Sequence, residues 1–184
     1  MLGIMTLFII YSCNSSQDIF KENKEGWDIF GDANWNFSKK ELVGKISEGT
    51  GFVMTQNTYK SFILELEFRP DSTINSGVFV RCKNKEITPI DCYEFNIWDL
   101  NPNQDYRTGS IVRMAGPLAY VETIDKWNKY KIKVEKNHIQ VWINNVLTVD
   151  VKDEKHLEGY IGLQASGRGA VSFRKVRITD LNKN

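Results

Sequence analysis

Two short segments near the middle of the chain combine charged, amide and aromatic side chains, the residue types that can bind sugars or transfer protons. They read Asn-Ser-Gly-Val-Phe-Val-Arg at 75–81 and Tyr-Glu-Phe-Asn-Ile-Trp-Asp at 93–99. Both alternate with the two-residue period of a β-strand, in which successive side chains face opposite sides of a sheet. On one face of each strand lie Asn75, Gly77, Phe79 and Arg81, and Glu94, Asn96 and Trp98. We expect a sugar-binding or acid/base surface there.

Glu94 is the strongest acid/base candidate. It lies mid-strand between Tyr93 and Phe95, where a carboxylate is disfavoured unless it is paired. Arg81 is equally unusual at the end of an apolar run, and an arginine across from a glutamate would hold the carboxylate ionised and oriented. The pair could serve chemistry or be a structural ion pair. The other carboxylates near these strands are Asp91, Asp99, Asp105 and Glu122, of which all but Asp99 are most simply solvated charges.

Metal and cofactor chemistry find no support in the sequence. The two histidines, His138 and His156, lie in or beside predicted turns, and neither has a second ligand at strand or helix spacing. We expect both to be solvated turn residues. The chain has no glycine-rich phosphate loop, no G-x-S-x-G elbow and no Cys-x-x-Cys pair. We therefore expect no cofactor and no metal, and carboxylates must carry any acid/base work.

Cys82 and Cys92 lie at the facing ends of the two central strands. In an exported protein they could close the mouth of a hairpin as a disulfide, or they could remain two buried thiols. If they pair directly, Arg81 faces Tyr93, and Arg81 and Glu94 then lie on opposite faces. The disulfide and the Arg81–Glu94 pair are thus compatible only if a bulge or an intervening strand changes the register.

The rest of the chain predicts a sheet protein. Apolar residues alternate with polar ones at 62–68, 130–135, 139–143, 146–151, 159–164 and 170–179. Turn residues separate these segments, and Asn144-Asn145 tolerates the left-handed backbone angles that two-residue hairpins require. No segment has helical periodicity over three turns. We therefore expect an all-β fold, an antiparallel sandwich of two sheets.

Composition limits the class of partner. The 184 residues carry 24 basic and 23 acidic side chains, so the formal net charge is +1, and no basic stripe suggests binding to nucleic acid or to an anionic membrane surface. Hydrophobic residues make up 41% of the chain, enough for one sizeable core. One domain is expected.

The N-terminus has the pattern of an export signal. Residues 1–10 are apolar apart from Thr6, and Ser12-Cys13 follows before a polar run. This pattern resembles a bacterial lipoprotein signal, with Cys13 as the lipidated residue; an ordinary secretory signal is the alternative. We expect a signal segment at 1–13, a tether at 14–26 and a β-sandwich domain at 27–184. The protein would then be a periplasmic or cell-surface lipoprotein, touching the membrane only through this anchor.

The central motifs resemble a known family. The segments 75–81 and 93–99, followed by Thr-Gly-Ser-Ile at 108–111, are similar to the core pattern of the 3-keto-disaccharide hydrolase domain family. The similarity continues through Trp127-Asn128 and Gly-Tyr-Ile-Gly-Leu-Gln at 159–164, and covers about residues 26–181. The resemblance implies a concanavalin-like jelly roll of two antiparallel sheets, with a carbohydrate cleft on the concave sheet.

The resemblance also implies an activity. Enzymes of this family cleave glycosides whose sugar is oxidised at C3, because the ketone acidifies the C2 hydrogen and a general base can then drive loss of the C1 substituent. Glu94 would be the base and Arg81 its catalytic partner; Arg81 or Arg107 could face the enolate oxygen. The remaining substrate-binding candidates are Asn75, Asn96, Trp98, Asp99, Arg107, Thr108 and Trp142. On this resemblance Arg81 and Glu94 share the concave face, and the disulfide is the less expected outcome.

The chain departs from the family pattern at three positions. Asn96 replaces the Gln of many members, and Ala165-Ser166-Gly167 stands where many carry a histidine after Leu-Gln. Val141 stands where some members carry a histidine before the late Trp. Without these histidines the chain lacks two natural acid/base residues, but the binding face is kept. The sequence is therefore compatible with three functions: a hydrolase acting on 3-keto-glycosides, a non-catalytic carbohydrate-binding lipoprotein, and a structural or partner-binding sandwich.

Overall fold

The computed structural model describes residues 15–21, 23–85, 87 and 90–182. Strands dominate this part of the chain, and one short 3₁₀ helix, η1 (Gln104–Tyr106), interrupts the long segment between β8 and β9. The strands are β1 (Gln17–Asp18), β2 (Trp27–Gly31), β3 (Asn34–Phe37), β4 (Leu42–Ile46), β5 (Thr50–Thr55), β6 (Phe62–Pro70), β7 (Ile74–Cys82), β8 (Tyr93–Ile97), β9 (Asn128–Glu135), β10 (His138–Ile143), β11 (Val146–Lys152), β12 (Tyr160–Gly167) and β13 (Gly169–Asp180).

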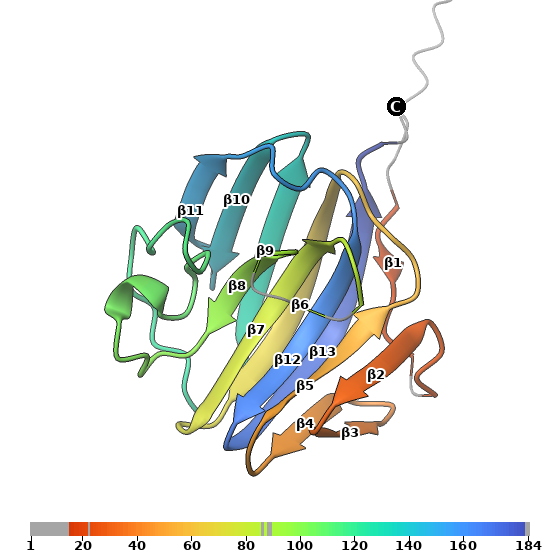
Figure 1. Ribbon diagram of the computed structural model, residues 1–184, viewed down its shortest axis with the longest axis vertical. Coiled ribbons are helices and arrows are strands. Elements are labelled where there is room, and N and C mark those ends of the chain that lie inside the picture. Colours follow the sequence, from red (N-terminus) through yellow and green to blue (C-terminus); the bar gives the residue numbers. More distant parts are fainter. Residues whose placement is uncertain (1–14, 22, 86, 88–89, 183–184) are drawn as a thin grey trace, which may run out of the picture.

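The strands form two antiparallel sheets packed face to face. Sheet A has the order β11-β10-β9-β6-β13-β4-β3, with β1 paired to β13, and sheet B has the order β2-β5-β12-β7-β8. Figure 1 shows sheet B in front of sheet A, with β7 and β12 at its centre. The predicted all-β, jelly-roll sandwich is confirmed.

Alternation along the strands builds the core between the sheets. Val78 and Val80 on β7 and Phe95 on β8 point inward and are fully buried with Leu64 and Ile132 from sheet A. Their neighbours in sequence therefore face outward from sheet B. These outward residues include a second, smaller apolar cluster on the outer side of sheet B.

The hairpin turns follow the predicted turn chemistry. Asn144 and Asn145 have φ angles of 51° and 68°, so both central residues of the β10–β11 turn are left-handed, as a two-residue hairpin requires. Lys136 in the β9–β10 turn also has a positive φ, of 53°. The register of β9, β10 and β11 places their apolar residues on the core side of sheet A.

The predicted tether is partly folded onto the domain. Gln17 and Asp18 form β1 against β13, the backbone N–H of Ile19 donates to the carbonyl oxygen of Val176, and the indole of Trp27 donates to the carbonyl oxygen of Ile19. Residues 17–19 of the predicted tether are thus part of the folded domain. Cys13 lies outside the described residues. Across the described ranges, no helix has the length and apolar character needed to cross a bilayer.

Candidate functional site

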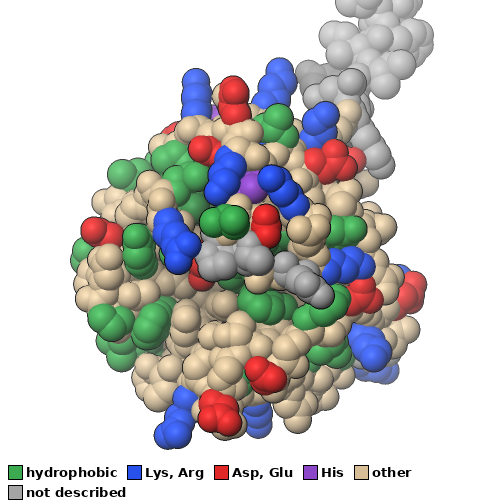
Figure 2. Space-filling view, in the orientation of Figure 1, with side chains coloured by type: hydrophobic (Ala, Val, Ile, Leu, Met, Phe, Trp, Pro, Cys, Tyr) green, Lys and Arg blue, Asp and Glu red, His purple; other side chains and the backbone are tan. Residues whose placement is uncertain are grey.

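The outward side of sheet B, called the B face below, carries three of the polar residues that the sequence singled out, Asn75, Glu94 and Asn96. Figure 2 looks onto this face and shows a shallow hollow in mostly uncharged surface below the grey atoms. The register of β5, β12, β7 and the edge strand β8 brings together on it Thr50, Phe52, Met54, Asn75, Gly77, Phe79, Glu94, Asn96, Tyr160, Gly162, Gln164 and Ser166.

The centre of the B face is Gly77. Asn96 lies directly opposite it on β8, and Gln164 lies opposite it on β12. A Cβ at position 77 would lie 3.3 Å from the Phe79 ring and from the carbonyl oxygen of Phe95, and 3.6 Å from the Gln164 Oε1 atom. The Gly77 backbone thus forms a floor between two amide side chains, with the edge of the Phe79 ring beside it. Glu94 is one pair further along β8, opposite Phe79. A planar or ring-shaped ligand could therefore lie on the Gly77 backbone within reach of Glu94.

Three amide oxygens on the B face lack partners. Asn75 Oδ1, Asn96 Oδ1 and Gln164 Oε1 are buried and accept no hydrogen bond from the described residues. Native proteins rarely leave such atoms unsatisfied, because each costs the desolvation of the group. Ligand hydroxyl groups are donors that would satisfy these oxygens, so the arrangement suits a polyhydroxylated ligand.

Glu94 has a half-buried carboxylate with no hydrogen-bond partner among the described residues. Burial raises the pKa of this carboxyl, and the positive charge of Arg113 partly opposes the rise. A carboxylate with a raised pKa is a better proton acceptor at neutral pH than an exposed one. Glu94 thus combines a raised pKa with a place on the B face, the two properties that a candidate general base needs.

Arg113 was not among the predicted site residues. It lies in the turn between Ile111 and Ala115, with a positive φ of 65°, and the adjacent Val112 N–H donates to the carbonyl oxygen of Glu94. The turn thus adds a guanidinium beside the outer edge of β8. One hint of its role was present in the sequence, since Arg113 lies two residues beyond the 108–111 motif. The turn that brings it to β8 could not be predicted from the alternation of apolar and polar residues.

The predicted Arg81–Glu94 pair is wrong. Arg81 is completely buried and points away from the B face; its Nε and Nη1 atoms donate over 3.0 Å each to the carbonyl oxygens of Lys60 and His156. Phe79, and not Arg81, is the cross-strand partner of Glu94. Arg81 therefore ties the end of β7 to two connecting segments and has no access to a ligand on the B face.

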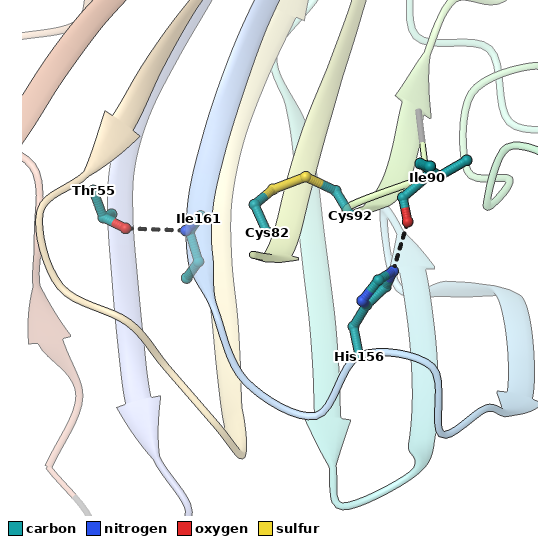
Figure 3. The surroundings of a disulfide bond; sticks show 6 residues. All are labelled: Thr55, Cys82, Ile90, Cys92, His156 and Ile161. Atoms are coloured by element: carbon teal, nitrogen blue, oxygen red, sulfur yellow. Dashed lines mark hydrogen bonds between the residues drawn. A yellow bond between two sulfur atoms is a disulfide. The ribbon is translucent and has the colours of Figure 1, made fainter. Parts of the chain in front are cut away.

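A bulge explains the correction. Arg81 has a φ of 54°, and the β7–β12 register shifts between the pair Cys82–Tyr160 and the pair Phe79–Gly162. The extra residue turns Arg81 inward and lets Cys82 share the outer side with Phe79. Cys82 and Cys92 are joined by a disulfide (Figure 3), so the less expected of the two outcomes is the one present.

Three of the predicted substrate-binding residues, Asp99, Arg107 and Thr108, use their side chains to bond other residues of the 98–127 segment. The Asp99 carboxylate accepts hydrogen bonds from the N–H and Oγ1 of Thr123, and Thr108 Oγ1 accepts from the N–H of Trp98. The Arg107 guanidinium donates to Glu122 and stacks on the Tyr120 ring at 4.4 Å. These residues hold the wall beside β8 in place. Their predicted direct role at a ligand has no support from this geometry.

The two candidate stacking tryptophans lie apart. Trp142 is on the outer side of sheet A, where the Lys131 ammonium lies 5.1 Å from the centre of its ring, so it cannot stack on a sugar bound at the B face as predicted. Trp98 directly follows β8 and is half-buried. Only Trp98 of this pair remains a candidate for contact with a ring on the B face.

The histidines do not join the site. His138 is on sheet A and pairs with Asp150. His156, predicted to be solvated, is buried: its Nε2 atom donates to the carbonyl oxygen of Ile90 (Figure 3), and burial lowers its pKa. No group of three or more possible metal-ligating side chains occurs in the part of the chain that the structure describes.

A wide groove of about 1210 Å³ lies elsewhere, at the end of the sandwich near Tyr59, Lys136 and Asp180. It contains none of the predicted site residues, and none of the unsatisfied amide oxygens lines it. The B face is therefore the better candidate site.

Comparison with known families gives one match over most of the chain. Residues 16–179 match the 3-keto-alpha-glucoside-1,2-lyase-like domain. No curated protein sequence matches the chain.

Several solved structures share the fold. A protein of Parabacteroides distasonis ATCC 8503 described as a candidate glycosyl hydrolase has 24% sequence identity and a TM-score of 0.79, covering 91% of this chain and 100% of its own. The carbohydrate binding module CBM66 from Bacillus subtilis has 18% identity and a TM-score of 0.68, covering 88% and 99%. A Bacillus licheniformis beta-glucanase has 14% identity and a TM-score of 0.62, covering 93% and 100%.

Proposed function

Because the chain belongs to the 3-keto-alpha-glucoside-1,2-lyase-like domain family, we propose that its B face binds a glucoside oxidised at C3 and that Glu94 removes the proton on C2. The observation that carries the proposal is the position of Glu94: an unpartnered, half-buried carboxylate beside three unsatisfied amide oxygens and the bare backbone of Gly77. The likeness to carbohydrate-active folds supports a sugar ligand.

The chemistry follows from the ketone. A carbonyl at C3 acidifies the C2–H bond, since the electron pair left on C2 delocalises onto the C3 oxygen as an enolate. Glu94 takes the C2 proton. The enolate then re-forms the C3 carbonyl, a double bond forms between C1 and C2, and the C1–O bond breaks, so that the aglycone leaves with the bonding pair. Water adding across C1 and C2 gives the free 3-keto sugar.

The residues around Glu94 suit the other parts of this reaction. The positive charge of Arg113 acts on the Glu94 carboxyl, and its guanidinium could stabilise the negative enolate oxygen. Asn75 and Gln164 would accept hydrogen bonds from ring hydroxyl groups through their free oxygens. Arg81 and Arg107, which the sequence suggested for the oxyanion, are engaged elsewhere.

A purely carbohydrate-binding role is the second candidate, and one feature favours it. The Asn96 amide nitrogen donates to the carbonyl oxygen of Tyr106, and the B face carries no histidine among its described residues. Protonation of a poor leaving group would then fall to Glu94 or to solvent. Binding without release of the aglycone would identify this role.

The test uses 4-nitrophenyl 3-keto-α-D-glucopyranoside, whose elimination releases coloured nitrophenolate. Glu94→Gln should lower kcat/KM by a factor on the order of 10²–10⁴, the usual contribution of a general base. Glu65→Gln is the matched control, because Glu65 is also mid-strand but lies on β6 between Lys131 and Arg177 of sheet A. Full turnover by Glu94→Gln would overturn the catalytic role, and binding without turnover by the wild type would favour the second candidate.

We also propose that the protein is exported and anchored through a lipid on Cys13. The apolar run before Ser12-Cys13 supports this. Labelling of cells with a radioactive fatty acid, followed by recovery of the protein, should mark the wild type and leave Cys13→Ala unmarked; a labelled Cys13→Ala protein would contradict the anchor.

A further inference from the structure

Lys85, in the connection between β7 and β8, reaches across the B face to the opposite edge of sheet B. Lys85, three residues after β7, forms an ion pair with Asp28 on β2, and its ammonium lies 5.2 Å from the centre of the Tyr160 ring on β12. Sheet B has the order β2-β5-β12-β7-β8, so this contact spans four strands. A side chain anchored at the far edge requires the intervening chain to pass over the face.

Ile87 fills the space beneath this crossing. It packs with a cluster of outward apolar side chains on sheet B that includes Met54 and Phe79. Its Cδ1 atom would lie 3.4 Å from a Cβ placed on Gly162, and Met54 Sδ would lie only 2.5 Å from it. This end of the B face is therefore already occupied by the protein's own side chains, and the absence of a side chain at Gly162 is what permits the packing.

The returning end of the connection is held as firmly as its start. The disulfide joins Cys82 to Cys92, the N–H of Lys83 donates to the carbonyl oxygen of Asp91, and buried His156 donates to the carbonyl oxygen of Ile90 (Figure 3). Three independent contacts thus fix the base of the connection next to β8.

The free part of the B face begins where this crossing ends. Along β7, Phe79 belongs to the covered cluster, Gly77 is the bare floor and Asn75 lies beyond it. Glu94 is paired with Phe79 and therefore stands at the boundary between the covered and the free part. A ligand within reach of Glu94 can extend past Asn75 and its partner Ser166, but it cannot extend past Phe79.

We infer that Lys85 and Ile87 set substrate specificity by closing one end of the site, so that it accepts a terminal sugar ring and rejects an internal one. The inference rests on the proposed function, because it takes the reacting ring to lie on Gly77 beside Glu94. The ring attacked at C2 has its aglycone on the open side, toward Asn75 and Ser166. A second sugar attached to the opposite side of that ring would have to occupy the volume of Ile87.

Two probes that release the same nitrophenolate test this. The first is 4-nitrophenyl 3-keto-α-D-glucopyranoside, which has a terminal oxidised ring. The second is 4-nitrophenyl α-maltoside oxidised at C3 of the ring that bears the nitrophenyl group, which makes the oxidised ring internal. For the wild type, kcat/KM should be at least about a hundredfold higher for the first probe. The double variant Lys85→Ala/Ile87→Gly should reduce this ratio at least about tenfold, mainly by a gain on the second probe.

Lys83→Ala is the matched control, because Lys83 is an exposed lysine of the same connection and should leave the ratio unchanged. Calorimetric dissociation constants of both probes with Glu94→Gln protein give the same ratio without chemistry, so the inference does not depend on turnover. A wild-type ratio near one, or a ratio that the double variant does not change, overturns the role of Lys85 and Ile87 and leaves the proposed function intact. Failure of both probes to bind overturns the proposed function and the inference together.

Discussion

Phe79 lies directly opposite Glu94 in the β7–β8 pair, whereas Arg81 points into the end of the sandwich. The carboxylate on the B face therefore has an aromatic neighbour and no cross-strand cation. This explains why burial raises the pKa of Glu94: the positive charge that acts on it, that of Arg113, lies in a separate turn and only partly opposes the rise. A salt-bridged Glu94 would have been held ionised and would be a weaker base.

Arg81 is predicted to be a residue of stability and not of catalysis. Arg81→Ala removes a fully buried side chain and leaves the carbonyl oxygens of Lys60 and His156 without their donor. Urea unfolding should show a loss of about 3 kcal/mol, from the unsatisfied carbonyls and the cavity together. Turnover per folded molecule should stay within about twofold of the wild type; a hundredfold loss in folded protein would restore Arg81 to the catalytic site.

The disulfide should contribute to stability through the short loop that it closes. Cys82 and Cys92 are ten residues apart in sequence. Replacing both by Ala should lower the free energy of unfolding by about 2–3 kcal/mol, because the unfolded chain regains the freedom of that loop. The comparison is denaturation of the wild type and the variant without reductant. Equal midpoints would show that the loop is held by its other contacts alone.

The raised pKa of Glu94 makes a prediction about stability and pH. Above the pKa values of the folded and unfolded states the ionised carboxylate carries its burial cost, and well below the unfolded value of about 4.5 both states are protonated and the cost vanishes. Glu94→Gln should therefore unfold at higher urea than the wild type at pH 7, and this gain should shrink as the pH falls toward 4. A gain that grows on acidification would contradict a raised pKa.

Gln164 is predicted to bind the ligand through an amide that the fold leaves free. Its Oε1 atom is buried without a partner, while its backbone carbonyl is engaged by the hydroxyl of Ser76. Gln164→Ala should weaken binding of methyl 3-keto-α-D-glucopyranoside roughly tenfold, the value of one hydrogen bond to a sugar hydroxyl, measured by calorimetry.

Gln140→Ala provides the control for that measurement, since Gln140 projects from the outer side of sheet A and bonds to Asp150. It should bind the sugar as the wild type does. Unchanged affinity in Gln164→Ala would place the ligand elsewhere.

Much of the fold could be predicted from alternation. The segments at 62–68, 130–135 and 139–143 became β6, β9 and β10, and the Asn144-Asn145 turn has the left-handed backbone expected of it. Periodicity succeeds in these strands because one side must be buried and the other need not be. The position of Glu94 on the outward side was correct for the same reason.

The predicted positions of side chains were wrong where a single residue or a single long-range contact decides which way the side chain points. A single bulged residue, Arg81, reversed the predicted face, and nothing in the alternation of 75–81 marks it. The sequence around Trp142 alternates as regularly as the sequence around Trp98. Alternation does not say which sheet a strand joins, and Trp142 lies on sheet A because β10 pairs with β9 and β11. His156 was taken for a solvated residue because its burial depends on Tyr93 and on the carbonyl of Ile90, both far from it in sequence.

The bulge at Arg81 has a further consequence for how this sheet can change. Before the bulge the odd-numbered residues of β7 point outward, and after it Cys82, an even-numbered residue, does so. One extra residue therefore inverts the parity of the strand and decides on which side of the sheet the covalent link is made. Deleting a residue there would turn the cross-link toward the core and remove the covalent support of the β7–β8 connection, without altering any residue that we propose to bind the sugar.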